Sequence, residues 1–278
     1  MITVQDLSKQ YGEQIIFDRV SFTIGPGERV GLVGRNGHGK TTLLRLLIGE
    51  EAYDAGRVTL PRDYRVGHQA QHIRFTKPTV LEEGCLGLPE DAQSDEWRVK
   101  KTLSGLGFTE EDFGRSPDEL SGGYRMRLSL TKVLVSDPNL LLLDEPTNFL
   151  DIVSIRWLER FLRAWQGELI VITHDRGFMD SVTTHVMGIY RTKLRKIAGS
   201  TKKYYEQIVQ EEEVYEKRRI TQEKKRKQTE QFINRFRSKA RHAGMVQSRI
   251  KALEKQGSME KLVEAPVLSF SFNAAPCP

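Results

Sequence analysis

Apolar and polar positions follow two patterns along the first 200 residues. Three short apolar runs occur: one ends at Leu32-Val33, the second covers 140–143 and the third covers 169–173. Each run is too short for a buried helix. We interpret these runs as buried strands. Helical periodicity begins at 42–47, directly after the first run, and recurs at 128–134. Strands that alternate with helices in this way predict an α/β fold.

A glycine-rich segment lies between the first apolar run and its helical pattern. Gly34–Thr41 has the spacing G-x-x-x-x-G-K-T, which between a strand and a helix is typical of a phosphate-binding loop. Glycines let backbone N–H groups close around phosphate oxygens, and the helix N-terminus adds its positive dipole end. Lys40 is placed to reach the β- and γ-phosphates, and the Thr41 hydroxyl to ligate Mg²⁺. The strand and helix on either side disfavour the alternative, a glycine-rich turn with a chance lysine.

Two acidic residues end the second apolar run. Asp144 and Glu145 follow four leucines and precede Pro146, so we place them at the C-terminal edge of a buried parallel strand. Adjacent carboxylates repel each other unless a cation lies nearby. We therefore expect Asp144 to hold Mg²⁺, directly or through water, and Glu145 to orient or deprotonate the attacking water.

A second glycine pair begins another helical pattern upstream of the acidic strand end. Ser121 precedes Gly122 and Gly123. Serine is a favourable N-cap, and the glycines expose further backbone N–H groups at a helix start. The triplet alone is an ordinary loop, but its place in the chain indicates a second anion-binding helix N-terminus.

Taken in order, these segments together with Leu150-Asp151 and His174 resemble an ATP-binding-cassette ATPase over residues 1 to about 200. The resemblance implies a P-loop NTPase fold with a helical subdomain, ATP and Mg²⁺ as ligands, and ATP hydrolysis. It gives Glu145 a catalytic role and makes His174 the switch histidine that contacts the γ-phosphate. The nucleotide-binding residues that it implies are Tyr11, which would stack on adenine, and Gly34, Asn36, Gly37, Gly39, Lys40, Thr41, Thr42, Ser121, Gly122, Gly123 and Asp151.

The resemblance also implies that the site is shared between two cassettes. Ser121, Gly122 and Gly123 would bind the γ-phosphate of an ATP held mainly by a different cassette, and Asp151 would cross to that partner. The γ-phosphate-sensing glutamine has two candidates, Gln69 and Gln71. Family spacing favours Gln71, to which we assign a catalytic role and, with Thr41 and Asp144, a contact to Mg²⁺.

Several positions depart from the family pattern or carry no chemistry of their own. His38 replaces a small residue in the phosphate loop, and His72 stands where an acid is common. Neither change removes a catalytic group. The five histidines other than His174 show no metal-ligand spacing.

One stretch points to a subfamily. Glu145–Asp151 reads E-P-T-N-F-L-D and resembles the E-P-T-N-x-L-D form of the ABC-F class, which comprises soluble tandem ATPases that act on ribosomes. Phe149 departs from the histidine usual in that class. The resemblance implies a translation-associated factor, with the ribosome and tRNA as partners.

The segment 201–255 carries the basic character of the chain. It holds sixteen Lys or Arg against eight Asp or Glu, a net charge of +8, whereas the whole chain carries +6. Helix formers dominate, with apolar positions at 232–236 and 246–253, so we predict two antiparallel helices with a basic tip at about 233–244. A solvated helix is the alternative, but clustered cations with interleaved aromatics favour a nucleic-acid backbone as partner. The candidate contacts are Lys224, Lys225, Arg226, Lys227, Arg235, Arg237, Lys239 and Arg241.

These expectations divide the chain into three parts. They are a cassette at 1–200 with a helical subdomain at about 72–135, a basic helical hairpin at 201–256, and a tail at 257–278 that leads toward a second cassette absent from this sequence. Trp97, Val99, Leu103, Leu106 and Phe108 are the expected core of the subdomain. A second cassette, in a longer chain or through head-to-tail self-association, is the expected partner, and we expect weak hydrolysis without it.

Composition is compatible with a cytoplasmic protein. The first twenty residues have no signal-peptide pattern, no run has the length of a membrane span, and Cys85 and Cys277 do not argue for a disulfide. Two other functions would share the ATP motifs: the nucleotide-binding subunit of a membrane transporter and a DNA-repair cassette ATPase. The basic hairpin disfavours the first. The second would have long coiled coils or zinc cysteines inserted in the cassette, and the sequence has neither.

Overall fold

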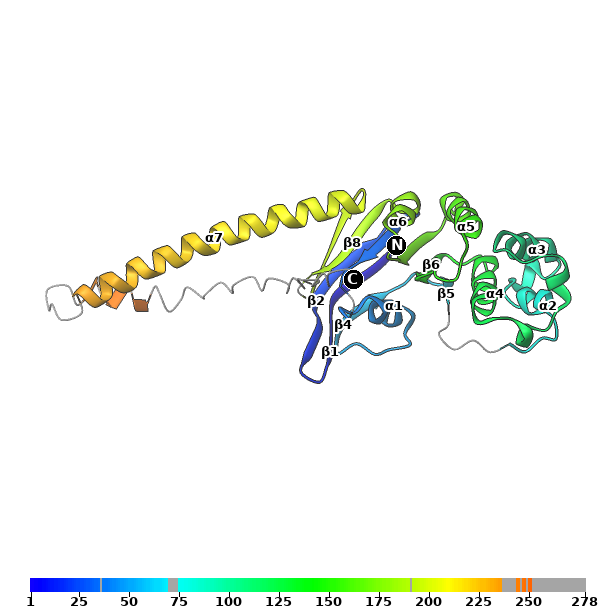
Figure 1. The fold of residues 1–278 in the computed structure, drawn as a ribbon. Helices are drawn as coiled ribbons and strands as arrows, with labels where there is room; N and C mark the ends of the chain where they lie inside the picture. Colours follow the sequence, from blue (N-terminus) through cyan, green and yellow to red (C-terminus); the bar gives the residue numbers. More distant parts are fainter. Residues whose placement is uncertain are drawn as a thin grey trace, which may run out of the picture. The chain divides into compact units, whose positions relative to one another are not determined.

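The fold was analysed in a computed structural model of the 278-residue chain (Figure 1). The structure describes residues 1–35, 37–69, 75–190, 192–236, 244–245, 247–248 and 250–251, excluding the side chain of residue 236. The chain divides into two compact units, Met1–Tyr204 and Tyr205–Pro278. The first contains the sheets and the short helices, and we describe the second separately.

Within the described residues, the strands of the first unit form two sheets. A three-stranded antiparallel sheet has the order β2-β1-β4, and a six-stranded sheet has the order β5-β6-β7-β3-β8-β9. All pairs in the larger sheet are parallel except β8 with β9. The strands are β1 Ile2–Tyr11, β2 Gln14–Ile24, β3 Arg29–Val33, β4 Ala55–Thr59, β5 Val66–His68, β6 Leu140–Asp144, β7 Glu168–Ile172, β8 His185–Tyr190 and β9 Lys193–Ala198.

Helices follow the parallel strands, as the alternating pattern predicts, and the α/β class is confirmed. Helices α2, α3 and α4 gather in a group of their own beside the sheets (Figure 1). The helices are α1 Lys40–Ile48, α2 Val80–Cys85, α3 Glu96–Gly105, α4 Gly122–Val135, α5 Ile152–Ala164, α6 Arg176–Val182 and α7 Thr201–Phe236, with short 3₁₀ turns at Glu90–Ala92, Glu111–Gly114 and Pro117–Glu119.

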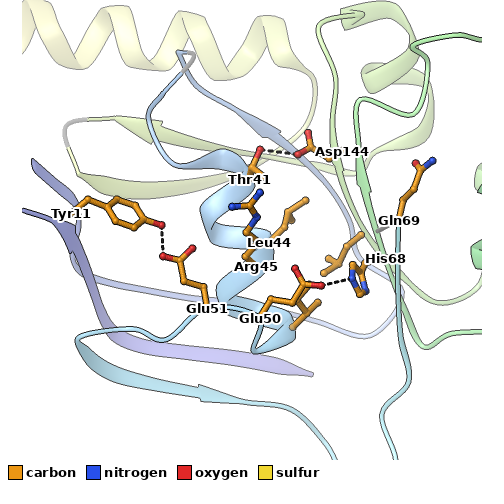
Figure 2. A pocket seen from close by; sticks show the side chains of 11 residues that line it. Tyr11, Thr41, Leu44, Arg45, Glu50, Glu51, His68, Gln69 and Asp144 are labelled. Carbon is orange, nitrogen blue, oxygen red and sulfur yellow. Dashed lines mark hydrogen bonds and ion pairs between the residues drawn. The ribbon is translucent and has the colours of Figure 1, made fainter. Parts of the chain in front are cut away.

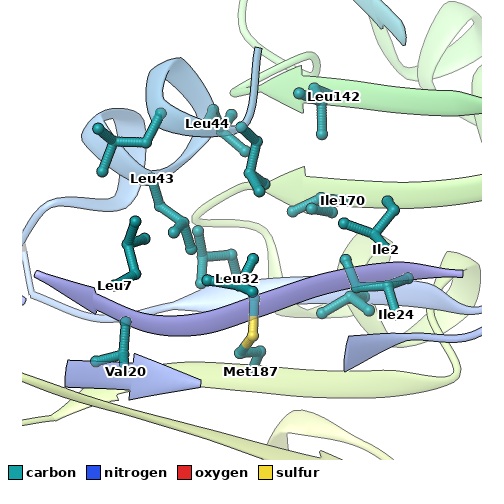
Figure 3. Packing of buried hydrophobic residues seen from close by; sticks show 14 of the residues in the cluster. Ile2, Leu7, Val20, Ile24, Leu32, Leu43, Leu44, Leu142, Ile170 and Met187 are labelled. Carbon is teal, nitrogen blue, oxygen red and sulfur yellow. The ribbon is translucent and has the colours of Figure 1, made fainter. Parts of the chain in front are cut away.

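Helix α1 packs in a core between the two sheets. Leu43 of α1 shares a cluster with Leu32 and Leu142 of the larger sheet and with Leu7 of the smaller one (Figure 3). Because side chains alternate across a strand, Leu141 and Leu143 point to the opposite face, where they pack with helices α4, α5 and α6. Burial on both faces explains why the first four residues of β6 are leucine, and it confirms the buried parallel strand predicted there.

A third cluster forms the interior of the helical group. It contains Val99, Leu103 and Phe108, as expected. Leu106 is buried but belongs to the cluster beneath α5. The prediction for Trp97 was wrong, since this side chain is 61% exposed. Trp97 lies two residues from Val99, about 200° around a helix, and so points away from the buried face.

Helix α7 begins on the first unit and runs as one helix for 36 residues, about 54 Å at 1.5 Å per residue. Its first turn is held where the Thr201 hydroxyl donates to Asp180 Oδ2 at 2.9 Å. Phe236 lies three residues beyond the start of the predicted hairpin tip at 233–244, most of which is outside the described residues. Residues 244, 245, 247, 248, 250 and 251 are helical. The tail 257–278 also lies outside the described residues.

Candidate active site

The phosphate loop connects β3 to α1, and its geometry explains the glycine that precedes the lysine. Gly39 has φ +89°, and a Cβ atom there would lie 2.3 Å from Ile16 Cγ2. Only glycine avoids both problems. Gly39 is also the N-cap of α1 and makes no side-chain hydrogen bond to the helix, so the first-turn N–H groups of α1 are left to a ligand.

The side chain of Lys40 folds back across the loop. Its ammonium donates to the carbonyl of Gly34 at 2.7 Å and to that of Arg35 at 3.3 Å. These bonds keep the cation at the mouth of the loop, where it can meet the phosphates that the N–H groups attract. Asn36, predicted to contact the nucleotide, lies outside the described residues.

Two oxygen ligands for a divalent cation lie side by side. The Thr41 hydroxyl donates to Asp144 Oδ2 at 2.7 Å, although the two residues are 103 positions apart. A hydroxyl and a carboxylate suit a hard cation such as Mg²⁺, which takes its other ligands from water and from substrate phosphates. In the part of the chain that the structure describes, no group of three or more His, Cys, Asp or Glu could hold a metal by itself. The donor set therefore fits Mg²⁺ bound together with a nucleotide.

Glu145 lines the same cavity as its neighbour Asp144 but has different partners. Its backbone has φ +51°, a left-handed conformation that is uncommon outside glycine. The carboxylate turns to His174: Oε1 lies 3.3 Å from His174 Nε2, and Oε2 accepts the His174 backbone N–H at 3.3 Å. The turn relieves repulsion between two adjacent acids and gives each one a separate task.

These groups meet at one cavity of about 330 Å³. Its walls come from the loop after β3, from the start of α1, and from the C-terminal ends of β6 and β7 and the residues that follow them; these three strands are neighbours in the sheet. Ligands bind at this edge in open parallel sheets. The predicted residues that line the cavity are Gly37, Gly39, Lys40, Thr41, Thr42, Asp144, Glu145 and His174.

Tyr11 lies in a second, larger cavity of about 680 Å³ alongside α1 (Figure 2). Thr41 and Asp144 line both cavities and so join them. The Tyr11 hydroxyl donates to Glu51, which raises the pKa of Tyr11, and Lys9 Nζ lies 4.9 Å from the ring centroid. The adenine contact stays a prediction. Glu51 and Lys9, which contact Tyr11, were not predicted, because they belong to no recognisable sequence motif.

The structure describes only one of the two candidate glutamines. Gln71, the assigned γ-phosphate sensor, lies outside the described residues. Gln69 lines the larger cavity, where its amide donates to the carbonyl of Met126 in α4 at 3.0 Å. Gln69 thus links the end of β5 to the helix that follows the second glycine pair.

Ser121, Gly122 and Gly123 line neither of these cavities. As predicted, Ser121 is the N-cap of α4, and its hydroxyl accepts the Tyr124 backbone N–H at 3.5 Å. A Cβ atom on Gly122 would meet nothing within 4 Å. This second helix N-terminus therefore lies outside both cavities.

Asp151 has an additional role within its own cassette. Its Oδ1 caps α5 by accepting the N–H groups of Val153 at 3.0 Å and Ser154 at 2.9 Å. Its Oδ2 lies 3.2 Å from Nη1 of Arg127. The Ser154 N–H and the Arg127 guanidinium hold the pKa of Asp151 below its usual value.

Arg127 is a site residue that the sequence reasoning missed. Its side chain is mostly buried and also donates to the carbonyls of Phe149 at 2.9 Å and Leu106 at 2.9 Å. It therefore fixes α4 to the segment 149–151. The only sequence signal is an arginine on the apolar face of a helical pattern, because these partners are far apart in the chain.

The candidate nucleic-acid residues Lys224, Lys225, Arg226, Lys227 and Arg235 are exposed on α7. Arg237, Lys239 and Arg241 lie outside the described residues. In the described part of the chain, no helix has the length and apolar character needed to cross a membrane.

Comparison with known proteins identifies the families and relatives that this chain resembles. Residues 17–148 match a family described as ABC transporter, and residues 187–271 match a second family of the same description. The probable ATP-binding protein YheS of Escherichia coli K12 is 34% identical over 99% of this chain and 48% of its own length. ATP-binding cassette sub-family F member 3 of Rattus norvegicus is 30% identical over 91% of this chain and 40% of its own length. The chain thus spans about half the length of the curated relatives it matches.

Solved structures agree on the fold. The structure titled ATP binding subunit of ABC transporter has a TM-score of 0.62 at 20% identity, covering 75% of this chain and 93% of its own. The dimeric bacterial ABC transporter cassette MJ0796 has a TM-score of 0.59 at 22% identity, covering 71% of this chain and 98% of its own.

Proposed function

We propose a function from the premise that this chain belongs to the ABC-F family of ATP-binding-cassette ATPases. The chain binds ATP with Mg²⁺ at the phosphate-loop cavity and hydrolyses the ATP to ADP and phosphate. The observation that carries this proposal is the convergence of Lys40, Thr41, Asp144 and Glu145 on one cavity. A cation, two oxygen ligands and a carboxylate base are the groups that phosphoryl transfer to water needs.

Each side chain has a distinct task in this reaction. The Lys40 ammonium offsets charge on the β- and γ-phosphates, while Thr41 and Asp144 would hold Mg²⁺, which when bound neutralises further phosphate charge. Glu145 orients the attacking water and accepts its proton as the water oxygen bonds to the γ-phosphorus and the bond to the β-phosphate breaks. His174, 3.3 Å from Glu145, keeps this base in place and contacts the γ-phosphate. Gln71 would sense the γ-phosphate from the loop after β5.

The second half of the site comes from another cassette. Ser121, Gly122 and Gly123 line neither cavity beside the phosphate loop, which favours their use on an ATP bound elsewhere. The second cassette belongs either to a longer chain or to another copy arranged head to tail. Hydrolysis by this chain at low concentration is therefore slow.

A measurement of turnover against chain concentration tests this part of the proposal. We expect turnover per chain to rise over a roughly hundredfold increase in concentration, because dilute chains lack a partner. Glu145→Gln should abolish turnover and keep ATP binding, whereas the exposed Glu110→Gln should change neither. High turnover that does not depend on concentration would contradict the shared site.

We further propose that the protein acts in the cytoplasm on the ribosome and tRNA, with α7 as its RNA-binding element. The net charge of +8 over 201–255 supports a polyanionic partner. In this cycle ATP brings two cassettes together, the closed form docks, and hydrolysis through Glu145 opens and releases it.

Ribosome co-sedimentation tests this cycle. Glu145→Gln chains incubated with ATP should pellet with ribosomes, and with ADP they should not. Equal pelleting with ATP, with ADP and without nucleotide would contradict the switch. Absence of pelleting under every condition would contradict the ribosome as partner of this chain.

A further inference from the structure

The charged side chains of α7 form columns along the helix. Residues seven apart nearly superimpose, because two turns of an α-helix take about 7.2 residues. Glu216, Glu223 and Glu230 are spaced by seven and form an acidic column. Arg219 and Arg226 form a second column with the same spacing, about 60° from the first.

The two columns are joined by ion pairs. Arg219 contacts Glu216 at 2.7 Å and Glu223 at 3.1 Å, and the Glu216 hydrogen bond raises the pKa of Arg219. Arg226 contacts Glu230 at 3.0 Å, and Lys227 contacts Glu223 at 3.4 Å. We call this set the paired ridge: Glu216, Glu223 and Glu230 with Arg219, Arg226 and Lys227. Such pairs support a helix locally.

Cations without acids occupy the opposite side of the helix. Arg218 and Lys225 are spaced by seven and lie about 160° from the acidic column, and Lys224 lies about 100° from it. All three are exposed, and within the described part of the chain none forms an ion pair. We call these three residues the free face. Lys217 lies at its edge and contacts Glu213 at 3.8 Å.

Uncharged polar residues fill the space between these cations. Thr221 and Gln228 are exposed and spaced by seven, in a column between those of Lys224 and Lys225. From 217 to 235 no acid falls on this side of the helix. A helix that only needed to be soluble would be served by both signs on every exposed side. Here the acids of this stretch lie on the paired ridge. The opposite side combines cations with uncharged polar side chains, and Phe232 continues the column of Arg218 and Lys225.

We infer that the free face, Arg218, Lys224 and Lys225, docks on the phosphate backbone of structured RNA, while the paired ridge stabilises the helix and makes no essential RNA contact. The inference rests on the proposed RNA-binding function and narrows it. It removes Arg226 and Lys227 from the candidate contacts, because their charges are already paired within the helix, and it adds Arg218. The Gln228 amide can donate hydrogen bonds to phosphate oxygens beside the cations, whereas the Thr221 hydroxyl donates to the Lys217 carbonyl at 2.8 Å.

Two triple variants of the full 278-residue chain distinguish the effect of net charge on RNA binding from the effect of where the charges lie on α7. Arg218, Lys224 and Lys225 are changed to Gln in one variant, and Arg219, Arg226 and Lys227 in the other. Each variant loses three positive charges from the same stretch of α7. The probe is fluorescently labelled unfractionated tRNA, titrated by anisotropy at several salt concentrations.

The free-face variant should lose affinity on the order of 100-fold at low salt, and its slope of log K against log salt should fall by about three. The paired-ridge variant should stay within about threefold of wild type. Circular dichroism at 222 nm checks helix content. If the ridge variant loses helicity, a cassette variant with Arg156, Arg160 and Arg163 changed to Gln supplies the same charge change without altering α7.

Four outcomes would overturn the inference in distinguishable ways. Equal losses in all the triple variants would mean that net charge alone matters, which overturns the free face but leaves RNA binding standing. A loss confined to the ridge variant, with its helix intact, would assign the contact to the opposite side. Tighter binding of duplex DNA than of tRNA would assign the face to DNA. Failure of the wild-type chain to bind tRNA would refute the proposed RNA partner itself.

Discussion

The two glycine-marked helix N-termini of the cassette are built differently. The N-cap of helix α1 is Gly39, which has no side chain to cap it, and the helix faces a cavity that also contains Lys40, Thr41 and Asp144. The N-cap of helix α4 is Ser121, whose own hydroxyl caps the helix. Gly122, the first residue of α4, meets open space.

The difference matches the proposed shared site, in which one chain would carry two unlike halves. The first N-terminus leaves its N–H groups to a ligand and surrounds them with charge. The second satisfies one N–H by itself and lies outside both cavities, as the proposed contact with an ATP held by another cassette requires. Two predictions test this contrast, and a third tests the ion pair between α4 and the N-cap of α5; they are given in order of decreasing effect.

Removal of the lysine should have the largest effect. Lys40→Ala should weaken ATP binding by this chain on the order of 100-fold, because charge-assisted bonds to phosphate are lost. Ser121→Ala should leave ATP affinity within about twofold, since α4 lies outside both cavities. Titration with a fluorescent ATP analogue measures both. Equal losses would mean that the two N-termini contact the same nucleotide.

The matched glycine substitutions should separate the two loops by stability. Gly39→Ala should lower the free energy of unfolding by about 3 kcal/mol, because it adds left-handed strain and a clash with Ile16. Gly122→Ala should stay within about 0.5 kcal/mol of wild type, since alanine favours helix and has room there. Urea unfolding followed by circular dichroism gives both values, and similar losses would contradict the contrast.

The smallest effect is expected on the pH dependence of stability. Asp151, which joins α4 to α5, has its pKa lowered by the Ser154 N–H and by Arg127. A carboxyl with a lowered folded pKa stabilises the fold above its unfolded pKa of about 3.9 and loses that contribution as the pH falls. Asp151→Asn should therefore cost stability at pH 7, by less than about 1 kcal/mol because the Asp151 side chain is half exposed to solvent, and should cost less at pH 3. Urea unfolding at both pH values measures this, and an equal cost at both would contradict the ion pair.

The C-terminal end of β6 could be predicted from the sequence, because a strand that is buried on both faces is a continuous run of apolar residues. Four leucines followed by Asp144 indicate a strand buried on both faces, and parallel pairing then brings that strand end to the phosphate loop. The different partners of Asp144 and Glu145 could not be predicted, because Glu145 has a left-handed backbone conformation that no sequence pattern records.

Contacts between residues far apart in the chain could not be predicted, because no local sequence pattern encodes them. Arg127 contacts carbonyls that lie 21 and 22 residues away, and no periodic pattern encodes them. Gln69 resembled a second γ-phosphate sensor but binds the backbone of Met126. Trp97 was assigned to a core by composition, although its position on α3 turns it outward.

The contacts of Arg127 also limit how this cassette can be recombined with its relatives. Its guanidinium joins α4 to Leu106, before that helix, and to Phe149 and Asp151, after it. A chimaera that exchanges only 121–135 would pair this arginine with a foreign backbone and leave a buried charge poorly matched. The smallest interchangeable block therefore extends from 106 to 151, and exchange experiments should place their junctions outside it.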